Sequence, residues 1–452
     1  MRLLVPLRDP SVALLWGGLS LSAIGDQLYM VAIVWIAVGL LGAWAGYLPA
    51  LGAAMVLATA LFAGCWADLV EPRPAMIAAD VVRAAALGLA VAEWSLRGHV
   101  SVATLVGLTV ILAAGQAVFR PALQGMLAPL VGVPSRLPAT NALLDTTDRI
   151  ARLLGPGLIA ALGTVLPARH FLSLDAASFV ASALVVMAIG RLRKLPPLRR
   201  AGAGEAFRDS VLRGFRAVAA HKLLALELRV SGALNGAWYA IVFLGLPLAI
   251  NRLGTSAGLG AYGLVISAYG STNLLATLLI GSRGMPANPG RMVFGGNLVM
   301  GIGMLLMAAT AMASLGPHAT VLGFAAAACV GAIGGPMHDI PVAVLRQTEL
   351  VREDVAAAVR ASLVVNNAGT LIAMAAVPAA YAVLPLAAVI TGCAAIILAI
   401  GLFGISRFPS RGPAGTMIAG LENRGPSGQQ PRRSQKRGGA QDDERVQPRG
   451  QE

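Results

Sequence analysis

Long, uninterrupted runs of apolar residues are the feature that most limits how this chain can fold. A helix needs roughly 20 such residues to cross the hydrocarbon core of a bilayer. Hydrophobic residues make up 57% of the 452 residues and charged residues only 12%, whereas a soluble domain carries about 25% charge. This composition disfavours a soluble globular enzyme and excludes disorder for most of the chain. A transmembrane barrel is also disfavoured, because its strands would alternate apolar and polar residues.

Polar breaks between the apolar runs divide the chain into twelve predicted membrane helices. We expect these helices at residues 12–39, 43–65, 74–95, 101–120, 139–165, 170–190, 223–250, 258–281, 291–314, 318–343, 355–382 and 385–406. The first run follows Arg2 and Arg8, but it is too long for the apolar region of a signal peptide. We therefore interpret it as an uncleaved first helix.

The predicted helices form two halves of similar size. We expect an all-α polytopic membrane protein with two pseudo-symmetric six-helix bundles, at residues 1–190 and 223–406. The linker 191–222 is basic and Pro-rich, and from Glu205 onward it has the pattern of an amphipathic cytoplasmic helix. Gly, Pro, Gln and Arg dominate the tail 407–452, which we expect to be disordered. This plan is typical of many secondary transporters.

The positive charge of the chain is distributed unevenly between the predicted loops. The formal net charge of +14 would suggest nucleic-acid binding in a soluble protein. Here 28 of the 35 Lys and Arg residues fall on one side of the predicted membrane and 3 on the other. Basic loops remain in the cytoplasm. We therefore expect a multi-pass protein of the cell membrane with both termini cytoplasmic and no nucleic-acid partner.

The stretch GCWADLVEPRPAMIAADVVRA resembles the segment between helices 2 and 3 of the major facilitator superfamily. The matching residues are Gly64, Asp68 and Arg73. The resemblance implies the major facilitator fold, transport by alternating access, and a cytoplasmic gate to which these residues belong. The chain departs from the pattern at Leu69, where a basic residue is usual, and at Glu71, where a turn Gly is usual.

Further stretches are similar to the drug and siderophore exporter branch of that superfamily, which includes enterobactin and macrolide exporters. They read SAIGDQLYMVA, FRPALQ, ATNALLD, RIARLLGPG and LDAASF. Within the fourth stretch, Gly155, Pro156 and Gly157 resemble the Gly-Pro motif that antiporters carry in helix 5. The resemblance covers the amino-terminal half well and the carboxy-terminal half weakly. It implies a monomeric antiporter that exports small molecules.

Asp26 is the main candidate for proton coupling. It lies deep in the first predicted helix, with no basic residue within one turn. An ionisable residue at that depth suggests a function, and a buried carboxyl group without a partner holds its proton more firmly. We expect Asp26 to exchange a proton near neutral pH or to bind a cationic substrate. The alternative is that its carboxyl group caps or hydrogen-bonds a neighbouring helix.

Asp80 and Arg83 lie three residues apart near the predicted cytoplasmic end of the third helix. They can pair with each other, or Arg83 can pair with Asp68. Either arrangement predicts a structural gating network, to which we also assign Arg152.

A polar stripe runs along the predicted fifth helix. It consists of Asn141, Asp145, Asp148 and Arg152. Such a stripe must face protein or water rather than lipid. Structural ion pairs with Arg120 or Arg149 explain it, and a proton relay or a substrate contact through Asp145 and Asp148 is the other interpretation.

Aromatic residues are candidates for the wall of a substrate cavity. Tyr29 shares a helix face with Asp26, and Trp238 and Tyr239 lie in the middle of the seventh predicted helix. Pockets for apolar compounds are mostly apolar with few polar groups. Position in the aromatic belt at the membrane interface is the alternative for these residues.

For polar residues of the carboxy-terminal half we expect mainly solvated or structural roles. Glu227 and Arg229 open the seventh helix, so we expect them to be solvated. His338 and Asp339 lie near the predicted cytoplasmic end of the tenth helix, where a coupling role is the minor alternative. Three amides at membrane depth are expected to form hydrogen bonds between helices: Asn235, Asn273 and Asn297.

Several enzyme motifs are missing from the sequence. It has no GxxxxGK[ST] phosphate loop and no His/Cys cluster. Its three cysteines are far apart in apolar runs. We therefore expect no cofactor, no metal and no enzymatic activity, with a proton gradient as the energy source.

The sequence as a whole predicts a carrier that exports an amphipathic, drug-like small molecule in exchange for protons. A siderophore exporter or a lysophospholipid transporter of the same superfamily is the alternative. A channel or a non-transporting membrane scaffold is more remote.

Overall fold

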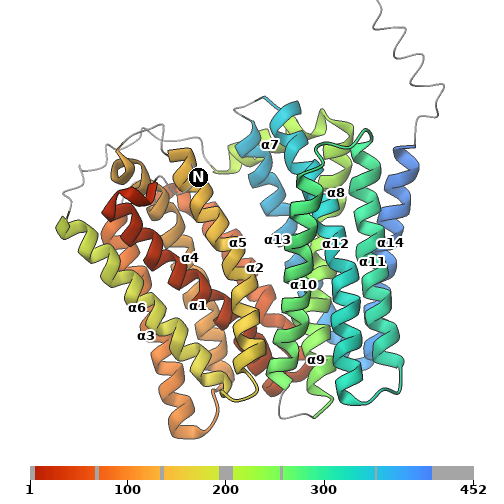
Figure 1. Cartoon of the computed structure of the whole chain (residues 1–452), viewed down its shortest axis with the longest axis horizontal. Helices are drawn as coiled ribbons and strands as arrows, with labels where there is room; N and C mark the ends of the chain where they lie inside the picture. Colours follow the sequence, from red (N-terminus) through yellow and green to blue (C-terminus); the bar gives the residue numbers. More distant parts are fainter. Residues whose placement is uncertain are drawn as a thin grey trace, which may run out of the picture. The chain divides into compact units, whose positions relative to one another are not determined.

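The computed structural model describes residues 6–66, 71–132, 137–192, 207–254, 258–351 and 354–409. Every regular element in these ranges is helical, as expected (Figure 1). The elements that come before the central linker are α1 (Pro10–Leu41), η2 (Gly42–Gly46), α2 (Tyr47–Trp66), α3 (Pro72–Arg97), α4 (Val102–Val131), α5 (Leu137–Leu162) and α6 (Ala168–Leu192).

The second series of elements begins with a short amphipathic helix. The elements are α7 (Phe207–Ala219), α8 (Lys222–Ala240), η4 (Ile241–Gly245), α9 (Leu246–Asn251), α10 (Gly258–Gly281), α11 (Pro289–Met312), α12 (Pro317–Glu349), α13 (Val355–Val383) and α14 (Leu386–Arg407). α7 packs against α13, where its Val211 and Val218 are buried. One expected span, 223–250, is occupied by α8, the π-turn η4 and α9 together.

Each of the twelve expected spans is occupied by helix. Ten segments of the described residues are long and apolar enough to cross a membrane, and one of them joins α1 to α2. α5 is not among the ten, because Asp145, Asp148, Arg149 and Arg152 make it too polar.

Two helices extend further than expected. α4, expected to end at residue 120, continues through Pro121 to Val131, and α12, expected to end at residue 343, just after Pro341, continues to Glu349. An internal proline removes a hydrogen bond and costs a few kcal/mol, so another contact must hold the extra turns. In α4 that contact is a cluster that buries Leu127 and Leu130, and in α12 it is a cluster that buries Leu345. Tertiary burial therefore overrides the stop signal of the proline.

Local signals set several helix ends. The Asp9 carboxylate accepts a hydrogen bond from the Ser11 amide at 2.9 Å and caps α1, with Pro10 in the first turn. Asn288 caps α11 in the same way through the Arg291 amide, at 3.1 Å. α3 ends at Gly98, whose φ of 78° favours glycine. These caps satisfy backbone groups that the helices leave unpaired.

The helix contacts of the first series are repeated in the second. α1 contacts α5 and α6, α3 contacts α4 and α6, and α2 contacts α4; correspondingly, α8 contacts α13 and α14, α11 contacts α12 and α14, and α10 contacts α12. The two most extensive contacts between the series are those of α5 with α10 and of α2 with α13. Exchanging the two series converts one of these pairs into the other, so the pattern is pseudo-symmetric.

The two ends of the bundle differ in how their cores are joined. We call the end where α1 begins and α14 finishes the amino-terminal end, and the opposite end, where η2 lies, the hairpin end. One apolar cluster reaches the hairpin end and contains residues of both series, including Leu48 and Leu244. At the amino-terminal end there are two separate clusters, one around Leu127 and one around Phe294. The described core is thus continuous between the series only toward the hairpin end.

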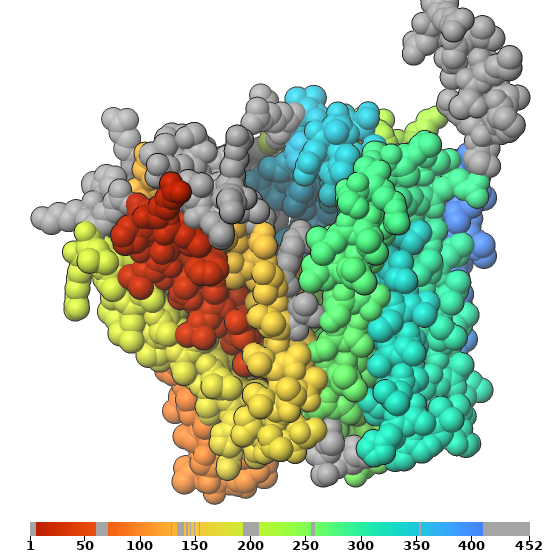
Figure 2. All heavy atoms as spheres, viewed as in Figure 1, coloured from red at the N-terminus to blue at the C-terminus, as the bar shows by residue number. Residues whose placement is uncertain are grey.

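Glycines allow α5 and α10 to approach closely where the two series meet. A Cβ atom at Gly263 would lie 2.7 Å from the amide nitrogen of Ala160 and 3.0 Å from the carbonyl oxygen of Pro156. Both are backbone atoms, so neither can move aside easily. In Figure 2 the yellow atoms of α5 meet the green atoms of α10 along this contact.

Gly263→Ala should destabilise the protein. Alanine normally stabilises a helix relative to glycine by about 1 kcal/mol, but overpacking at a tight contact costs about 1–3 kcal/mol. The control is Gly281→Ala in the same helix, where the added methyl group meets no atom within 4 Å. Thermal unfolding in detergent should give a lower midpoint for Gly263→Ala and an unchanged or higher midpoint for Gly281→Ala. Equal midpoints would contradict the close approach.

Candidate functional site

A cavity of about 290 Å³ lies between the two series of helices. Its lining comes from α1, η2, α2 and α4 on one side and from α8, η4 and α13 on the other. Most of the lining is aliphatic or aromatic. The polar side chains in it are Tyr29, Thr109, Tyr239, Asn367 and Thr370. Among the described residues that line the cavity, none carries a charge.

One face of α1 forms a large part of the wall. Met30, Ile33 and Ala37 recur there at helical spacing. Asp26 precedes Met30 by four residues, so it shares this face and lies one turn closer to the amino-terminal end. The carboxyl group that we expect to couple protons therefore lies next to the cavity, on the same face of α1, but is not part of its lining.

The three predicted wall residues have different surroundings. Tyr29 and Tyr239 line the cavity, and the Tyr239 ring packs against Phe243 at 4.7 Å between centroids. Trp238 does not line this cavity. Its ring packs against Tyr269 at 4.5 Å, beside a second space of about 10 Å³. Consecutive side chains of α8 point in different directions, and helix spacing alone does not predict which of the two faces the cavity.

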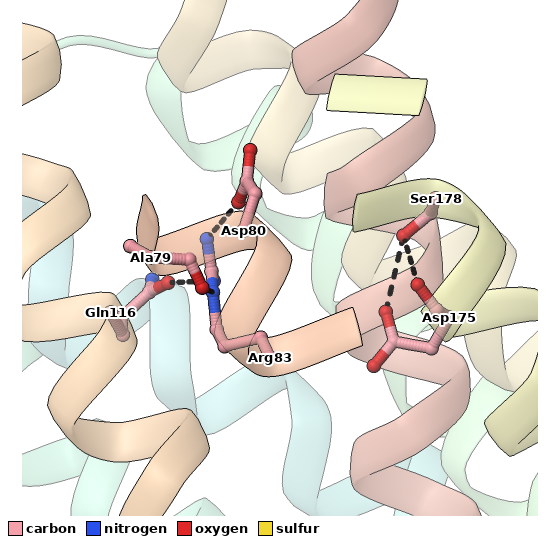
Figure 3. A network of polar contacts seen from close by, with 6 residues as sticks. All are labelled: Ala79, Asp80, Arg83, Gln116, Asp175 and Ser178. Atoms are coloured by element: carbon pink, nitrogen blue, oxygen red, sulfur yellow. Dashed lines mark hydrogen bonds and ion pairs between the residues drawn. The ribbon is translucent and has the colours of Figure 1, made fainter. Parts of the chain in front are cut away.

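Arg83 is the centre of a buried polar network behind the cavity (Figure 3). It forms an ion pair with Asp80, and the side chains are 2% and 0% exposed. Its Nη1 atom donates a hydrogen bond to the Gln116 Oε1 atom at 3.2 Å. The guanidinium group also lies over the rings of Phe179, at 4.0 Å, and Phe119, at 5.0 Å. The arginine charge is thus compensated by a carboxylate, an amide and two π faces.

Asp26 has no hydrogen bond or ion pair with any described side chain. The charged groups that act on it electrostatically are Arg83, Arg120, Asp80 and Asp148. The first belongs to the network described above. Asp26 is half-buried. These four charged groups surround it, but it forms no ion pair with any of them.

Asp175 in α6 joins this group of carboxylates, and sequence reasoning did not single it out. It is 0% exposed. The Ser178 hydroxyl group lies 3.2 Å from one of its carboxylate oxygens. The LDAASF stretch contained the signal, because it places an ionisable residue well inside a membrane helix.

The polar stripe of α5 is partly described. Asp148 lies 3.9 Å from Arg120, with both side chains exposed by more than 40%, so this pair contributes little. The Arg152 side chain of α5 is exposed and acts electrostatically on Tyr239 of α8, which belongs to the other series. The side chains of Asp145 and Arg149 lie outside the described residues.

The Gly-Pro motif lies within α5 and does not interrupt the helix. Gly155 contacts Gln27 of α1, so a side chain there would overlap Gln27. Pro156 lies at the contact with α10, and Gly157 faces Ser267 of the same helix.

The structure describes part of the expected cytoplasmic gate. Gly64 falls within α2, and Asp68 lies outside the described residues. The Arg73 Nη2 atom donates a hydrogen bond to the Met187 carbonyl oxygen at 3.2 Å. Arg73 therefore ties the start of α3 to the last turns of α6.

The carboxy-terminal half contains a second buried charge cluster. Glu227 is 5% exposed and pairs with Arg346 at 3.0 Å, and the His338 Nε2 atom lies 3.7 Å from it. The expectation that Glu227 is solvated is wrong, because α12 covers this end of α8 and supplies both partners. Arg229 is exposed, as expected.

Two of the three membrane-depth amides form the expected bonds between helices. The Asn235 amide donates to the Asn366 carbonyl oxygen at 3.0 Å and to Thr370 at 2.7 Å, and Asn273 donates to the Ala332 carbonyl oxygen at 3.1 Å. The buried side chain of Asn297 has no hydrogen-bond partner among the described residues, so that expectation is wrong.

Arg83→Met should destabilise the protein strongly. Removing one partner of a buried ion pair leaves an uncompensated charge and costs about 3–5 kcal/mol. Adding Asp80→Asn removes that charge and should restore most of the lost stability. Thermal unfolding of the single and double variants in detergent measures the difference. If Arg83→Met unfolds at the same temperature as the unaltered protein, the network does not carry the compensation described above.

Comparison of the chain with known proteins identifies its family and similar folds. The family model described as Major Facilitator Superfamily matches residues 15–374. No curated protein sequence matches the chain.

Several solved structures share the fold at low sequence identity. A mutant peptide transporter POT in complex with alafosfalin matches at TM-score 0.64 and 13% identity, over 87% of this chain and 93% of that chain. A POT family transporter in complex with 5-aminolevulinic acid gives 0.63 and 13%, over 88% and 96%. A bacterial homologue of the iron transporter ferroportin in an inward-facing state gives 0.60 and 16%, over 88% and 99%. At such identities the similarity establishes the fold alone.

Proposed function

The chain belongs to the major facilitator superfamily and is a transporter, and from that premise we propose that it exports an amphipathic small molecule in exchange for protons. The observation that carries the proposal is the relation between the uncharged cavity and Asp26. The carboxyl group shares the cavity-facing side of α1 and lies one turn beyond the lining. Substrate and proton can therefore act on the same helix from adjacent positions.

The cavity lining favours a largely apolar substrate. Aliphatic and aromatic side chains provide burial, and five neutral polar side chains provide hydrogen bonds. A peptide carries an ammonium and a carboxylate group, which would need opposite charges in the wall to replace their water. The POT structures share the fold, but the described lining here offers no such charges. Chemistry of the lining therefore supports a drug-like compound over a peptide.

The orientation of the protein supports export. Most Lys and Arg residues of the chain fall in the segments that precede, follow or connect helices on the side where the chain begins, and the positive-inside rule favours a cytoplasmic position for that side. At the same end the apolar clusters of the two series are separate, whereas one cluster joins them toward the hairpin end. This arrangement fits a carrier that admits its substrate from the cytoplasm.

Asp26 is the residue that we assign to proton coupling, with Asp145 and Asp148 as further candidates. Among the described residues its half-buried carboxyl group interacts with charges only at a distance, so protonation changes the charge of the site by one unit without breaking an ion pair to any of them. A change of that kind alters the relative stability of two conformations and can drive alternating access. Arg83 and Asp80 would hold the surrounding helices in position.

A charged substrate is the rival within the same superfamily. A siderophore or lysophospholipid would favour basic groups in the cavity wall. Arg83 is occupied by its own network, and Arg152 acts electrostatically on Tyr239 of the other series but does not belong to the lining. A channel or scaffold is disfavoured by the family and by the pseudo-symmetric contacts.

Transport in proteoliposomes tests the proposal. The purified protein is reconstituted, a pH gradient is imposed, and uptake of tetraphenylphosphonium, erythromycin and enterobactin is measured. We expect saturable flux of at least one probe that rises with the pH gradient. If flux of every transported probe ignores the gradient, proton exchange is wrong.

Asp26→Asn should separate transport from the proton gradient. The amide has the size of the carboxyl group but cannot take up a proton, so gradient-driven flux should fall to the rate observed without a gradient. Counterflow of the same probe should persist, because the cavity lining is unchanged. Asp209→Asn, on the exposed face of α7, is the matched control and should behave like the unaltered protein. Normal coupling in Asp26→Asn would remove this residue from the mechanism.

A further inference from the structure

One face of α6 is polar although it is completely buried. Asp175, Ser178 and Ser182 recur on it at helical spacing, with exposures of 0%, 2% and 1%. α6 packs against α1 and α3. Ser182 hydrogen-bonds to the Asp80 carboxylate, which anchors this part of the face to the Arg83 network. Asp175 and Ser178 have no hydrogen bond to that network among the described residues.

The hydrogen bonds of Asp175 are too few for a carboxylate ion. The Ser178 hydroxyl group lies 3.2 Å from the Asp175 Oδ1 atom and 2.8 Å from the Asp175 carbonyl oxygen, and it has one hydrogen to share between them (Figure 3). The Oδ2 atom has no hydrogen-bond partner among the described residues. A buried ion with this little compensation costs several kcal/mol.

The charges around Asp175 do not make up the deficit. α1 contributes Asp26, and α3 contributes Asp80 and Arg83. The arginine is the only cation in this group of described residues, and Asp80 and Gln116 already bind it. The two aspartates add negative charge. The environment therefore suits a neutral, protonated carboxyl group.

α1 passes directly over this carboxyl group. A Cβ atom at Gly25 would lie 2.6 Å from the Asp175 Oδ1 atom and 2.9 Å from the Ser178 Cβ atom. Asp26 is the next residue and lies about 100° further round the helix, on the face that continues the cavity. One turn of α1 thus has an acid on its cavity side and contacts a second acid on its α6 side.

We infer that Asp175 is a second proton-binding site, and that Asp175 and Asp26 form a two-carboxyl site on adjacent faces of α1. The inference rests on the proposed proton exchange and specifies its stoichiometry. Each carboxyl group takes up one proton and releases one proton per cycle, so two protons are exchanged. Asp175 holds its proton while Gly25 covers it, and it releases the proton when α1 moves away from α6.

Infrared titration of the purified full-length protein tests the inference without a substrate. The carbonyl stretch of protonated carboxyl groups is recorded across a pH series. The samples are the unaltered protein, Asp26→Asn, Asp175→Asn, the double variant and the exposed control Asp209→Asn. We expect each single variant to lose one titrating band. The remaining band should titrate at a shifted pH, because two ionised carboxylates repel each other.

Two outcomes would overturn the inference. The first is a spectrum that Asp175→Asn leaves unchanged, and the second is a band of Asp175 that titrates independently of Asp26. If Asp175→Asn does not fold, Ser178→Ala retains the carboxyl group and removes its donor, so it should shift the Asp175 band directly and the Asp26 band only through their mutual repulsion. No shift of the Asp175 band would also overturn the inference. Failure of proton-driven flux in proteoliposomes would instead contradict the proposed function. The infrared titration would in that case still show whether Asp175 and Asp26 bind protons in a coupled way.

Discussion

A charge that is buried between membrane helices must be compensated there, and the arrangement of the amino-terminal half depends on how Arg83 meets this requirement. The arginine binds Asp80 and Gln116 and lies over two phenylalanine rings. Because its guanidinium group is directed at these partners, the neighbouring carboxyl groups of Asp26 and Asp175 have no direct cationic partner among the described residues. A structural ion pair and two acids without such a partner are thus consequences of one constraint.

The same constraint separates structural from functional polar groups across the molecule. In the carboxy-terminal half, Glu227 is compensated by Arg346 and His338. Its described cavity-facing residues are neutral, and Asn235 is bonded to α13. The pseudo-symmetric contacts therefore support unequal chemistry: in the part of the chain that the structure describes, acids without a direct cationic partner lie in α1 and α6, whereas α8 and α12 hold a paired cluster. This asymmetry supports the proposal that coupling occurs in the amino-terminal half.

Sequence reasoning predicted the helices well, because membrane thickness and apolar composition fix their number and approximate length. It ended α4 at residue 120 and α12 at residue 343, because the burial that carries each helix further depends on distant residues such as Leu127 and Leu345. It interpreted Glu227 from its position at a helix end, whereas the covering helix decides its burial. The rotation of each helix was also inaccessible, so Tyr239 and Trp238 could not be distinguished as cavity residues. Asp175 was detectable as an acid within an apolar run, but its contact with Gly25 was not.

The most direct test of the central claim reverses the coupling. Proteoliposomes contain a pH-sensitive dye and no initial pH gradient, and a concentration gradient is imposed of a probe that the flux screen shows to be transported. Proton exchange predicts that protons move opposite to the probe, that the internal pH change saturates with probe concentration, and that protein-free liposomes show none. Protein-dependent probe movement without a change in internal pH would contradict the account.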